Sequence, residues 1–589
     1  MNKAKRLIGV GYLPKELPIE FTSTPLSRSY APISALIQQQ PPNRTGLAEK
    51  FNLARTGHAV RVLRVPNPIF FTAVATLIDA NWDRLKTVTS SSSLSISKPL
   101  FRALGKDRRT RATNLSPSQD LPERRLLSVA GQRYVLQTDF ARFFPSIYTH
   151  SIPWAIYGKS AAKRNRSPAL FGNALDKAVR DGQGGQTVGL PVGPDSSHIL
   201  SELIAARVDR AAFSRRTPSG FRYIDDYFLG FATEGAAMGA LDRLAEAARE
   251  YELELNYSKT SIRSVQDMRE GMGVDELRDF EFADPTNLTR SECHRIFAIA
   301  ERLRETEEYA LKFAIQMLAP RLVSAADWAI LESYLLRSGT LAPNCLDLVA
   351  FMLYRHSLLG APLNQERIIE YLTFIVSDGI TYNRDSCVTW ALWAFKSLGY
   401  QLPRKLTQRL SKTSNSIVAL LALDLRDRGQ LSGNLDVRPW TNLLQPDELY
   451  GEHWLLVYES VRSGWLNPVT PILQNDVIFN GLLHNNVQFY DNQRLARVTA
   501  LLRHLPRAEG RNHSYGPIQS FLLAIDPQEA AAEPVQAVQP GPEPAVVNID
   551  QIAGGDIFEY EDELTDEEID EDADEEEQEE EQEDPGWYY

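Results

Sequence analysis

An apolar, aromatic segment with two adjacent acidic residues at its centre is the feature that most constrains this chain of 589 residues. It reads Phe-Arg-Tyr-Ile-Asp-Asp-Tyr-Phe-Leu-Gly-Phe over residues 221–231. The apolar flanks favour two short strands, and Asp225-Asp226 favours the tight connection between them. Two carboxylates at the tip of a buried hairpin repel each other unless a cation lies nearby. Because hard oxygen ligands suit Mg²⁺, the pattern indicates a divalent-metal site, with an ordinary surface turn as the plain alternative.

Two features upstream favour the metal site over the plain turn. Asp139 follows the apolar residues 134–136, so it marks the end of an expected strand. Residues 189–194, Gly-Leu-Pro-Val-Gly-Pro, then form a loop that opens an expected helix over 196–210. An aspartate at a strand end, a Pro/Gly loop before a helix, and Tyr-x-Asp-Asp in a hairpin follow one another here. Three motifs in this order resemble the palm motifs of reverse transcriptases.

The composition is that of ordinary globular material. With 589 residues and 43% hydrophobic residues, the chain is expected to form about two to four domains. Its three cysteines, Cys293, Cys345 and Cys387, are widely spaced and form no Cys-x-x-Cys, so core positions are expected rather than a disulfide framework or a zinc site. No signal peptide is apparent, and no run reaches the roughly 18 apolar residues of a membrane helix. The expected location is therefore the cytoplasm, without membrane contact.

The net charge of −13 hides two parts of opposite sign. From Asp550 onward there are 21 acidic residues and no Lys or Arg, which leaves 63 basic against 55 acidic residues in the rest of the chain. A body with a basic surplus attracts phosphates, and an acidic tail competes for the same surface. Solubility is the plain alternative role of the tail, and the sequence leaves the two open.

The second half of the chain is expected to be helical. From about residue 288, apolar residues recur at helical spacing, with short Gly, Pro or Asn links between the runs. Many successive helices predict an irregular, HEAT-like helical-repeat domain over residues 286–525. Residues 526–589 are expected to be a Pro/Ala-rich linker and a disordered acidic tail. The helical runs are 296–318, 328–336, 346–359, 368–375, 387–398, 417–426 and 454–461.

A basic segment follows four consecutive serines at residues 90–93. Six cationic side chains within fourteen positions fit the binding of a nucleoside triphosphate, and a solvated basic loop is the plain alternative. These residues are Lys98, Arg102, Lys106, Arg108, Arg109 and Arg111.

Four further segments narrow the resemblance. Residues 11–18 read Gly-Tyr-Leu-Pro-Lys-Glu-Leu-Pro, and Pro66-Asn67-Pro68 precedes an expected helix. Residues 143–154 read Phe-Phe-Pro-Ser-Ile-Tyr-Thr-His-Ser-Ile-Pro-Trp, and residues 223–227 read Tyr-Ile-Asp-Asp-Tyr. Over roughly residues 10–285, the chain resembles the bacterial abortive-infection, or defence-associated, reverse transcriptases.

The resemblance implies an α+β fold, with right-hand polymerase fingers and palm over residues 1–285. It implies synthesis of DNA from dNTPs in anti-phage defence, with two Mg²⁺ ions and with Mn²⁺ as the alternative cation. Some members of the family work without a conventional template or primer and use a protein hydroxyl as primer, so that the DNA product is attached to protein. A noncoding RNA template, and homo-oligomerisation through the helical domain, are partners that the resemblance leaves open.

The resemblance also assigns the metal ligands. Asp139 would be the first ligand and Asp225 the second, with Asp226 beside them and the backbone carbonyl of Phe140 completing one shell. Nucleotidyl transfer by two metals about 3.5–4 Å apart activates the attacking hydroxyl and holds the leaving pyrophosphate. Carboxylates from two neighbouring strands can bridge such a pair. Removal of Asp139 or Asp225 is expected to abolish synthesis and to leave the fold nearly intact.

Two further elements are assigned to the nucleotide. Phe144 lies five residues after Asp139 and matches the steric-gate aromatic of the family, whose ring leaves no room for a 2′-hydroxyl. Its plain alternative is a core phenylalanine. Pro191, Val192 and Gly193 would contact the nucleotide, and a simple helix-leading turn is the alternative.

A lysine is assigned to the leaving group. Residues 256–260, Asn-Tyr-Ser-Lys-Thr, follow an expected amphipathic helix over 236–251 and resemble the motif that brings a lysine to the pyrophosphate. Lys259 would then be a general acid worth about 10²–10⁴-fold in rate. An exposed lysine in a turn is the alternative.

Two other functions stay open at this point. One is a mobile-element reverse transcriptase, such as a retron or group II intron relative, and the lack of a recognisable endonuclease or maturase segment argues against the intron version. The other is a catalytically idle module that binds RNA or senses phage. The complete set of Asp139, Asp225 and Asp226 argues against idleness.

Overall fold

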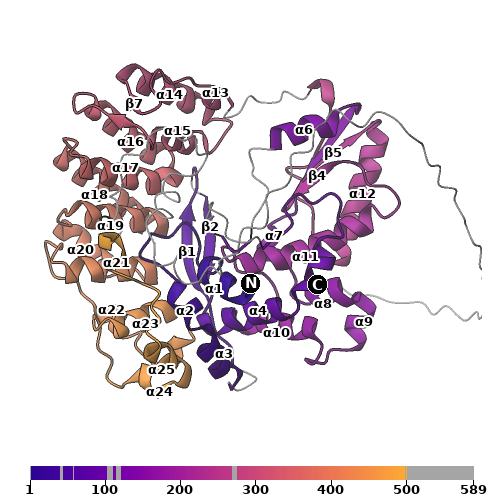
Figure 1. The fold of residues 1–589 in the computed structure, drawn as a ribbon, viewed down its shortest axis with the longest axis horizontal. Helices are drawn as coiled ribbons and strands as arrows, with labels where there is room; N and C mark the ends of the chain where they lie inside the picture. The colour runs from indigo at the N-terminus through magenta and orange to yellow at the C-terminus, as the bar shows by residue number, and fades with distance from the viewer. Residues whose placement is uncertain are drawn as a thin grey trace, which may run out of the picture. The chain divides into compact units, whose positions relative to one another are not determined.

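The computed structural model describes residues 2–39, 44–57, 59–101, 111–113, 121–267, 275–497 and 499, which all belong to one compact unit. The predicted linker and acidic tail lie outside the described residues. Helices and three small sheets make up the structure, so the predicted mixture of α and β elements is confirmed at this coarse level (Figure 1). Among the described helices, none has both the length and the apolar character needed to cross a membrane.

The first quarter of the chain contributes helices and a β-hairpin. Helix α4 begins at Pro68, directly after the Pro-Asn pair, because Asn67 caps it by accepting the Ile69 N–H and proline suits the first helical position. Most of α4 is buried, as its apolar run predicts. The elements are α1 (Lys3–Val10), α2 (Thr24–Arg28), α3 (Tyr30–Gln38), β1 (Glu49–Ala54), β2 (Val60–Val65), α4 (Pro68–Ala80) and α5 (Trp82–Thr89).

The middle of the chain forms a four-stranded antiparallel sheet in the order β4-β5-β3-β6. Its side chains alternate between two faces. Val135 and Phe228 pack in a small cluster toward α6, whereas Leu136 and Leu229 belong to the main core on the side of α11 and α12 (Figure 1). The elements are α6 (Leu121–Val129), β3 (Tyr134–Thr138), α7 (Phe143–Ser146), α8 (Ser151–Tyr157), α9 (Lys159–Arg164), α10 (Phe171–Asp181), α11 (Asp195–Ala212), β4 (Ser219–Tyr223), β5 (Asp226–Phe231), α12 (Glu234–Glu250) and β6 (Ser261–Ser264).

Beyond residue 275 nearly all regular elements of the described chain are helices, as the apolar periodicity predicts. Each long helix packs against helices one or two places along the chain. The predicted run 296–318 contains two helices rather than one, separated by the polar residues 304–309. The helices are α13 (Asp275–Arg278), α14 (Arg290–Leu303), α15 (Ala310–Leu318), α16 (Trp328–Leu341), α17 (Leu346–Leu358), α18 (Gln365–Thr381), α19 (Asp385–Leu398), α20 (Arg404–Leu410), α21 (Ser416–Asp427), α22 (Arg438–Thr441), α23 (Trp454–Arg462), α24 (Ile472–Asn475) and α25 (Val477–His484).

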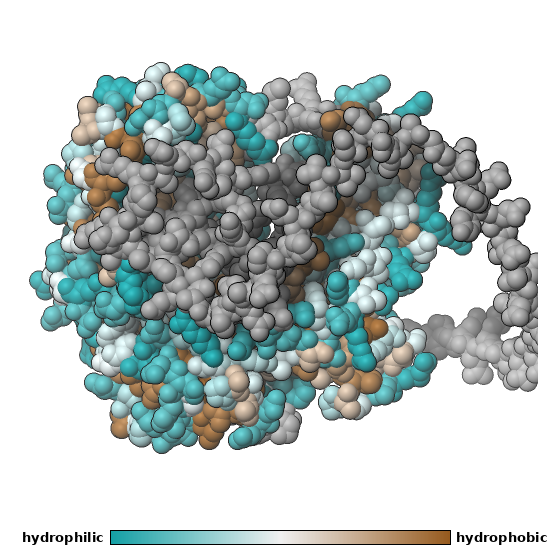
Figure 2. Space-filling model, in the orientation of Figure 1, coloured by the Kyte–Doolittle hydropathy of each residue, from teal (hydrophilic) through white to brown (hydrophobic). Residues whose placement is uncertain are grey.

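The short parallel pair β7 (Asn287–Leu288) and β8 (Leu322–Val323) lies at the start of this helical segment. All three cysteines are buried and free, as predicted for core residues. On the face that Figure 2 shows, the helical segment is mostly hydrophilic, with small hydrophobic groups between the polar ones. This distribution is normal for the outside of a packed helical array.

The β1–β2 hairpin is joined to the helical segment through the free edge of β1. The Asn52 N–H donates to Asp385 Oδ2 at 2.8 Å, and the Ala54 N–H donates to Ser386 Oγ at 2.9 Å. Asp385 and Ser386 are the first two residues of α19. Side chains at the start of a helix therefore accept hydrogen bonds from N–H groups of β1 that would otherwise be unpaired at the edge of the hairpin.

A buried ionic cluster ties the N-terminal segment to the helices. Lys396 Nζ lies 2.8 Å from Glu20 Oε1 and 2.6 Å from Asp424 Oδ2, and these three side chains are at most 1% exposed. Trp393 Nε1 donates to Glu20 Oε2 at 3.1 Å, and the Tyr490 hydroxyl donates to Asp424 Oδ2 at 2.7 Å. One ammonium group thus neutralises two carboxylates that come from distant parts of the sequence.

Replacement of this lysine is expected to destabilise the fold strongly. Lys396→Met leaves Glu20 buried without its cation and leaves Asp424 with Arg428 as its remaining cationic partner, which costs about 3–5 kcal/mol of unfolding free energy. Thermal and urea denaturation measure the loss. The matched control is Arg438→Ala, which breaks an exposed pair with Asp436 and should leave the midpoint unchanged. Equal midpoints for Lys396→Met and the wild type would contradict the role of the cluster.

Candidate active site

The two adjacent aspartates lie at the connection between β4 and β5. Tyr223 pairs with Asp226 across the hairpin, so the two-residue connection is Ile224-Asp225, and Asp226 is the first residue of β5. The prediction that Asp225-Asp226 forms the connection is therefore wrong by one residue. Ile224 has φ of 60°, in the left-handed region that β-branched side chains rarely adopt. Such a conformation costs on the order of 1–2 kcal/mol.

Asp139 and Asp226 meet at one end of the four-stranded sheet. The pairing of β3 with β5 ends at Thr138 opposite Tyr227, so the next opposite pair in this register is Asp139 and Asp226. Opposite residues on antiparallel strands have Cβ atoms about 4.5–5.5 Å apart. Asp139 is only 5% exposed, Asp225 is half-buried and Asp226 is exposed. The structure thus brings together the three acidic residues that the sequence singled out, and we call them the acidic cluster.

The acidic cluster carries unfavourable charge. Burial, followed by the nearby charges of Asp226 and Asp139, raises the pKa of Asp225 to about 6, against an opposing effect of Lys259. Burial and Asp139 also raise the pKa of Asp226, which Lys259 and Arg125 lower. Like charges at short range disfavour ionisation of each carboxyl group. A cation at this position would relieve the repulsion.

Lys259 supplies the nearest positive charge. Its Nζ lies 2.9 Å from Asp139 Oδ2, although 69% of the lysine side chain is exposed. The hydrogen bond with Asp139 is the main cause that raises the pKa of Lys259. The loop is anchored to the sheet, because the Asn256 N–H donates to the Asp139 carbonyl at 2.8 Å and the Thr138 and Thr260 hydroxyls lie 2.7 Å apart. Lys259 is therefore part of the acidic site rather than a remote surface lysine.

The donor set suits a hard cation, but its present arrangement is that of an ion pair. In the part of the chain that the structure describes, no group of three or more His, Cys, Asp or Glu side chains is arranged to hold a metal ion. Asp139 Oδ1 is nevertheless buried and has no hydrogen-bond partner within the described residues. A buried carboxylate oxygen without a donor is costly, and oxygen ligands of this kind are what Mg²⁺ prefers. The residues present therefore fit a magnesium ion in chemistry.

Only the backbone of Phe140 is available to the candidate site, because its side chain is buried. Its ring is 1% exposed, stacks on Phe143 at 4.9 Å and meets the Tyr227 ring edge-on at 5.6 Å. The side chain thus belongs to the core beneath the acidic cluster. The backbone carbonyl is the atom that the predicted role as a metal ligand requires.

Phe144 and the Pro/Gly loop lie side by side. The Leu190 N–H donates to the Phe144 carbonyl at 2.8 Å, and the Gly189 N–H donates to the Ile147 carbonyl at 2.8 Å. The Phe144 ring is only partly buried and packs against the ring of Phe143 at 5.5 Å. The predicted steric gate and the predicted nucleotide-contacting loop are therefore neighbours.

The Pro/Gly loop is also held by contacts with β2 and with Arg111. The Arg64 N–H of β2 donates to the Val192 carbonyl at 2.9 Å, and Arg111 Nη2 donates to the Gly193 carbonyl at 2.6 Å. Gly193 has φ of 128°, which only glycine adopts readily, and a Cβ there would lie 3.0 Å from Pro14 Cγ. Val192 and Gly193 are thus held in place by β2 and by Arg111.

The basic residues that were predicted to bind a triphosphate differ in where they lie and in what they contact. Arg102, Lys106, Arg108 and Arg109 lie outside the described residues. Arg111 is used structurally, because it donates to the Leu13 and Gly193 carbonyls and pairs with Asp195. Lys98 directly follows Ser97, whose Oγ accepts the Ile224 N–H at 2.7 Å, so it lies next to the aspartate hairpin.

Two basic residues near the site were missed by the sequence analysis. Arg125 of α6 lies over the Phe228 ring at 5.7 Å and is one of the charges that lower the pKa of Asp226. Arg64 lies on β2 beside the clamped loop. Neither belongs to a motif, and only the packing of α6 and β2 brings them to this position.

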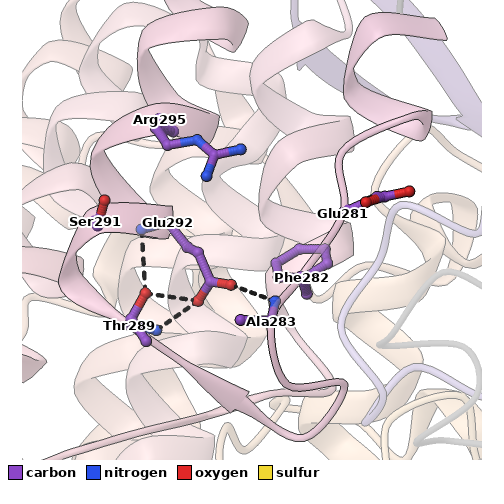
Figure 3. Close-up of a pocket in the computed structure, with 7 residues that line it drawn as sticks. All are labelled: Glu281, Phe282, Ala283, Thr289, Ser291, Glu292 and Arg295. Carbon is purple, nitrogen blue, oxygen red and sulfur yellow. Dashed lines mark hydrogen bonds between the residues drawn. The ribbon is translucent and has the colours of Figure 1, made fainter.

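A pocket of about 400 Å³ lies at the start of α14 and shares no residue with the acidic cluster. Figure 3 shows the Glu292 carboxylate turned toward Thr289 and Ala283. Glu292 accepts the backbone N–H groups of both, which caps the helix and uses the carboxylate's hydrogen-bonding capacity. We therefore assign this pocket no chemistry. Its lining residues are Glu281, Phe282, Ala283, Thr289, Ser291, Glu292 and Arg295.

Neutralisation of Asp225 is expected to stabilise the metal-free protein. Because the pKa of Asp225 is raised to about 6, ionisation of this carboxyl lowers the stability of the fold above pH 6. This loss of stability disappears as the pH falls toward the ordinary pKa of an aspartate. With a chelator present, Asp225→Asn should gain about 1–2 kcal/mol of stability at pH 8 and less at pH 5. Thermal melts at both pH values test this. Asp436→Asn is the control, because Arg438 lowers the pKa of that exposed carboxyl to about 2 and no gain is expected.

The acidic cluster, the lysine beside it and the clamped loop together form the candidate active site. No family model matches the chain, and no curated protein shows a significant sequence match to it. We therefore infer the activity of this chain from the chemistry of these side chains and from the order of the motifs in the sequence.

Proposed function

We propose that this chain is a DNA polymerase of the reverse-transcriptase type that transfers nucleotides from dNTPs by a two-metal mechanism. The observation that carries the proposal is the position of Asp139 next to Asp226 and Asp225 at the end of a four-stranded antiparallel sheet. Lys259 contacts this cluster, and the loop at residues 189–193 is hydrogen-bonded to Phe144 and Ile147, in the segment that follows Asp139. Each of these elements has a defined task in nucleotidyl transfer.

The acidic residues would hold the metal ions. Asp139 and Asp225 are the proposed ligands, with Asp226 and the Phe140 carbonyl in support. When bound, Mg²⁺ activates the attacking hydroxyl and stabilises negative charge on the transferred phosphate. For Asp139 to hold a metal ion, Lys259 Nζ has to leave Asp139 Oδ2, with which it pairs at 2.9 Å. An exposed, flexible lysine can make this movement, and it would then protonate the leaving pyrophosphate.

Other residues would select and bind the nucleotide. The partly buried ring of Phe144 would exclude a 2′-hydroxyl, and Pro191, Val192 and Gly193 would lie against the base pair. Lys98, together with Arg102, Lys106 and Arg108, would bind the triphosphate through charge-assisted hydrogen bonds. The hydrogen bonds that Val192 accepts from the Arg64 N–H and that Gly193 accepts from the Arg111 side chain support a fixed binding surface in this loop.

The wider setting of the proposal comes from the motif resemblance. We propose that the chain is an abortive-infection, anti-phage enzyme in which a fingers-and-palm region is joined to a helical-repeat scaffold. The helical segment would support the DNA product, an RNA template or a second copy of the chain. Extensive hydrogen bonding between β1 and the starts of α19 and α21 supports a scaffold that is fixed to the polymerase region.

The central test is synthesis by the purified full-length protein. It is incubated with labelled dNTPs and Mg²⁺ without template, and the products are then treated with protease. We expect label that stays attached to protein, and we expect Asp139→Asn and Asp225→Asn to abolish it with melting temperatures at or above that of the wild type. Label that appears only with added RNA and primer favours the mobile-element alternative. No label under either condition contradicts the polymerase and favours an RNA-binding or phage-sensing module.

The sugar selectivity of Phe144 is a separate prediction. Phe144→Ala removes the ring that would contact the 2′ position, so incorporation of ribonucleotides should rise by about 10- to 100-fold relative to dNTPs. The ratio of kcat/KM for the two substrates measures this. Phe143→Leu is the control, because Phe143 is a buried ring, 3% exposed, and should affect stability without changing sugar selectivity. An unchanged ratio in Phe144→Ala would remove the gate from the proposal.

A further inference from the structure

A buried charged cluster lies directly behind the aspartate hairpin. Arg222, two residues before the turn, has 0% exposure, and its Nη1 and Nη2 donate to Glu202 Oε2 and Oε1 at 2.9 Å each. Its Nε donates to Asp209 at 2.9 and 3.1 Å. Both acids come from α11 and are at most 3% exposed. All three guanidinium nitrogens therefore donate to the two carboxylates of α11.

This cluster holds both backbone groups of the strained turn residue. Arg222 Nη1 donates to the Ile224 carbonyl at 2.6 Å, and the Ile224 N–H donates to Ser97 Oγ at 2.7 Å. Ser97 is fully buried, and its Oγ lies 3.4 Å from Glu202 Oε2. The left-handed backbone of Ile224 is thus stabilised from its carbonyl and from its amide, and both contacts lead back to Glu202.

A second arm of the cluster does not touch the turn. Asp209 accepts from Ser92 Oγ at 2.6 Å and from the Tyr227 hydroxyl at 2.6 Å. These contacts hold β5 and the segment around residue 92 against α11. The cluster therefore has one arm at the turn and one arm in the scaffold, and each arm contains a buried serine.

Buried charges stabilise a protein little compared with a well-packed apolar core, so a charged cluster of this kind calls for another role. Strained backbone persists only where its surroundings over-determine it, and such strain gathers at functional sites. Here the strained residue directly precedes Asp225. A small displacement of this turn would move the Asp225 carboxylate relative to Asp139.

We propose that Ser97, Arg222 and Glu202 are positioning residues that hold the Ile224-Asp225 turn, and hence the Asp225 carboxylate, in register with Asp139. They touch neither substrate nor metal and act through the backbone of Ile224. The inference rests on the proposed function in so far as Asp225 is a metal ligand of the polymerase.

Ser97→Ala is the test variant, and Ser92→Ala is its matched control. Both remove a buried hydroxyl that contacts an acid of the same cluster, but only Ser97 contacts the turn. In the full-length protein, Ser97→Ala should lower kcat for DNA synthesis by about 10- to 100-fold at unchanged KM for dNTP. It should also weaken Mn²⁺ binding, measured by calorimetry, by about 10-fold. Ser92→Ala should leave kcat and Mn²⁺ affinity at their wild-type values, although its melting temperature should drop about as much as that of Ser97→Ala.

A double-mutant cycle separates positioning from general loss of stability. Ile224→Gly removes the steric cost of the left-handed backbone, so Ser97→Ala should cost less kcat in the Ile224→Gly background than in the wild type. Arg222→Lys keeps the charge and loses the paired donation to Glu202, so it should behave as Ser97→Ala. Equal effects of Ser97→Ala and Ser92→Ala on kcat and on Mn²⁺ affinity would overturn the proposal.

The Mn²⁺ measurement also separates this inference from the polymerase proposal. If the wild type binds Mn²⁺ through Asp225 but makes no DNA, and Ser97→Ala still weakens binding, the positioning role stands without the polymerase. If the wild type makes DNA and Ser97→Ala changes neither kcat nor Mn²⁺ affinity, the polymerase stands and the positioning role is wrong. A wild type that neither binds Mn²⁺ nor makes DNA overturns both.

Discussion

Electrostatic repulsion among three carboxylates is the constraint on which the candidate site depends. Antiparallel pairing of β3 and β5 places Asp139 and Asp226 at the same end of the sheet, and the hairpin adds Asp225. Burial, and after it this proximity, raises the pKa of Asp225, so ionisation of the carboxyl carries a cost here. Lys259 offsets part of the cost by its contact with Asp139, yet one buried oxygen of Asp139 stays without a donor within the described structure. A site that is destabilised in this way is suited to a cation, and this links the fold to the proposed chemistry.

Rigid backbone contacts surround the acidic cluster on several sides. The loop at residues 189–193 is fixed to the Phe144 segment, to β2 and to Arg111, and the turn at Ile224 is fixed to Arg222 and Ser97. The contacts of the loop with the Phe144 segment and β2 are backbone–backbone hydrogen bonds, and those at Gly193 and Ile224 join a side chain to the backbone. Lys259 is the exception, because its side chain is largely exposed. The site therefore combines hydrogen-bonded backbone segments with the cationic group of an exposed side chain.

The helical segment is integrated with the N-terminal region through polar contacts as well as packing. The start of α19 satisfies the edge of β1, and Glu49 of β1 accepts the Ser416 N–H at the start of α21. Strand β2 in turn contacts the loop at residues 191–193. The buried cluster around Lys396 joins Glu20 to α19 and α21. A continuous set of contacts thus connects the helices with the candidate nucleotide-binding loop.

The sequence by itself determined the local elements and the acidic residues of the site. Apolar periodicity located β3, α11, α12 and most of the later helices, and the Pro-Asn-Pro pattern located the start of α4, because these signals act over a few neighbouring residues. The exact hairpin connection was missed by one residue, since the buried partners of Ile224 stabilise a backbone that isoleucine rarely adopts. Only the tertiary structure decided that Lys259 contacts Asp139 across 120 positions, that Arg111 clamps Gly193, and that Arg125 lies near Asp226. Such contacts depend on how the sheet, α6 and the loops pack together, and no local pattern encodes that packing.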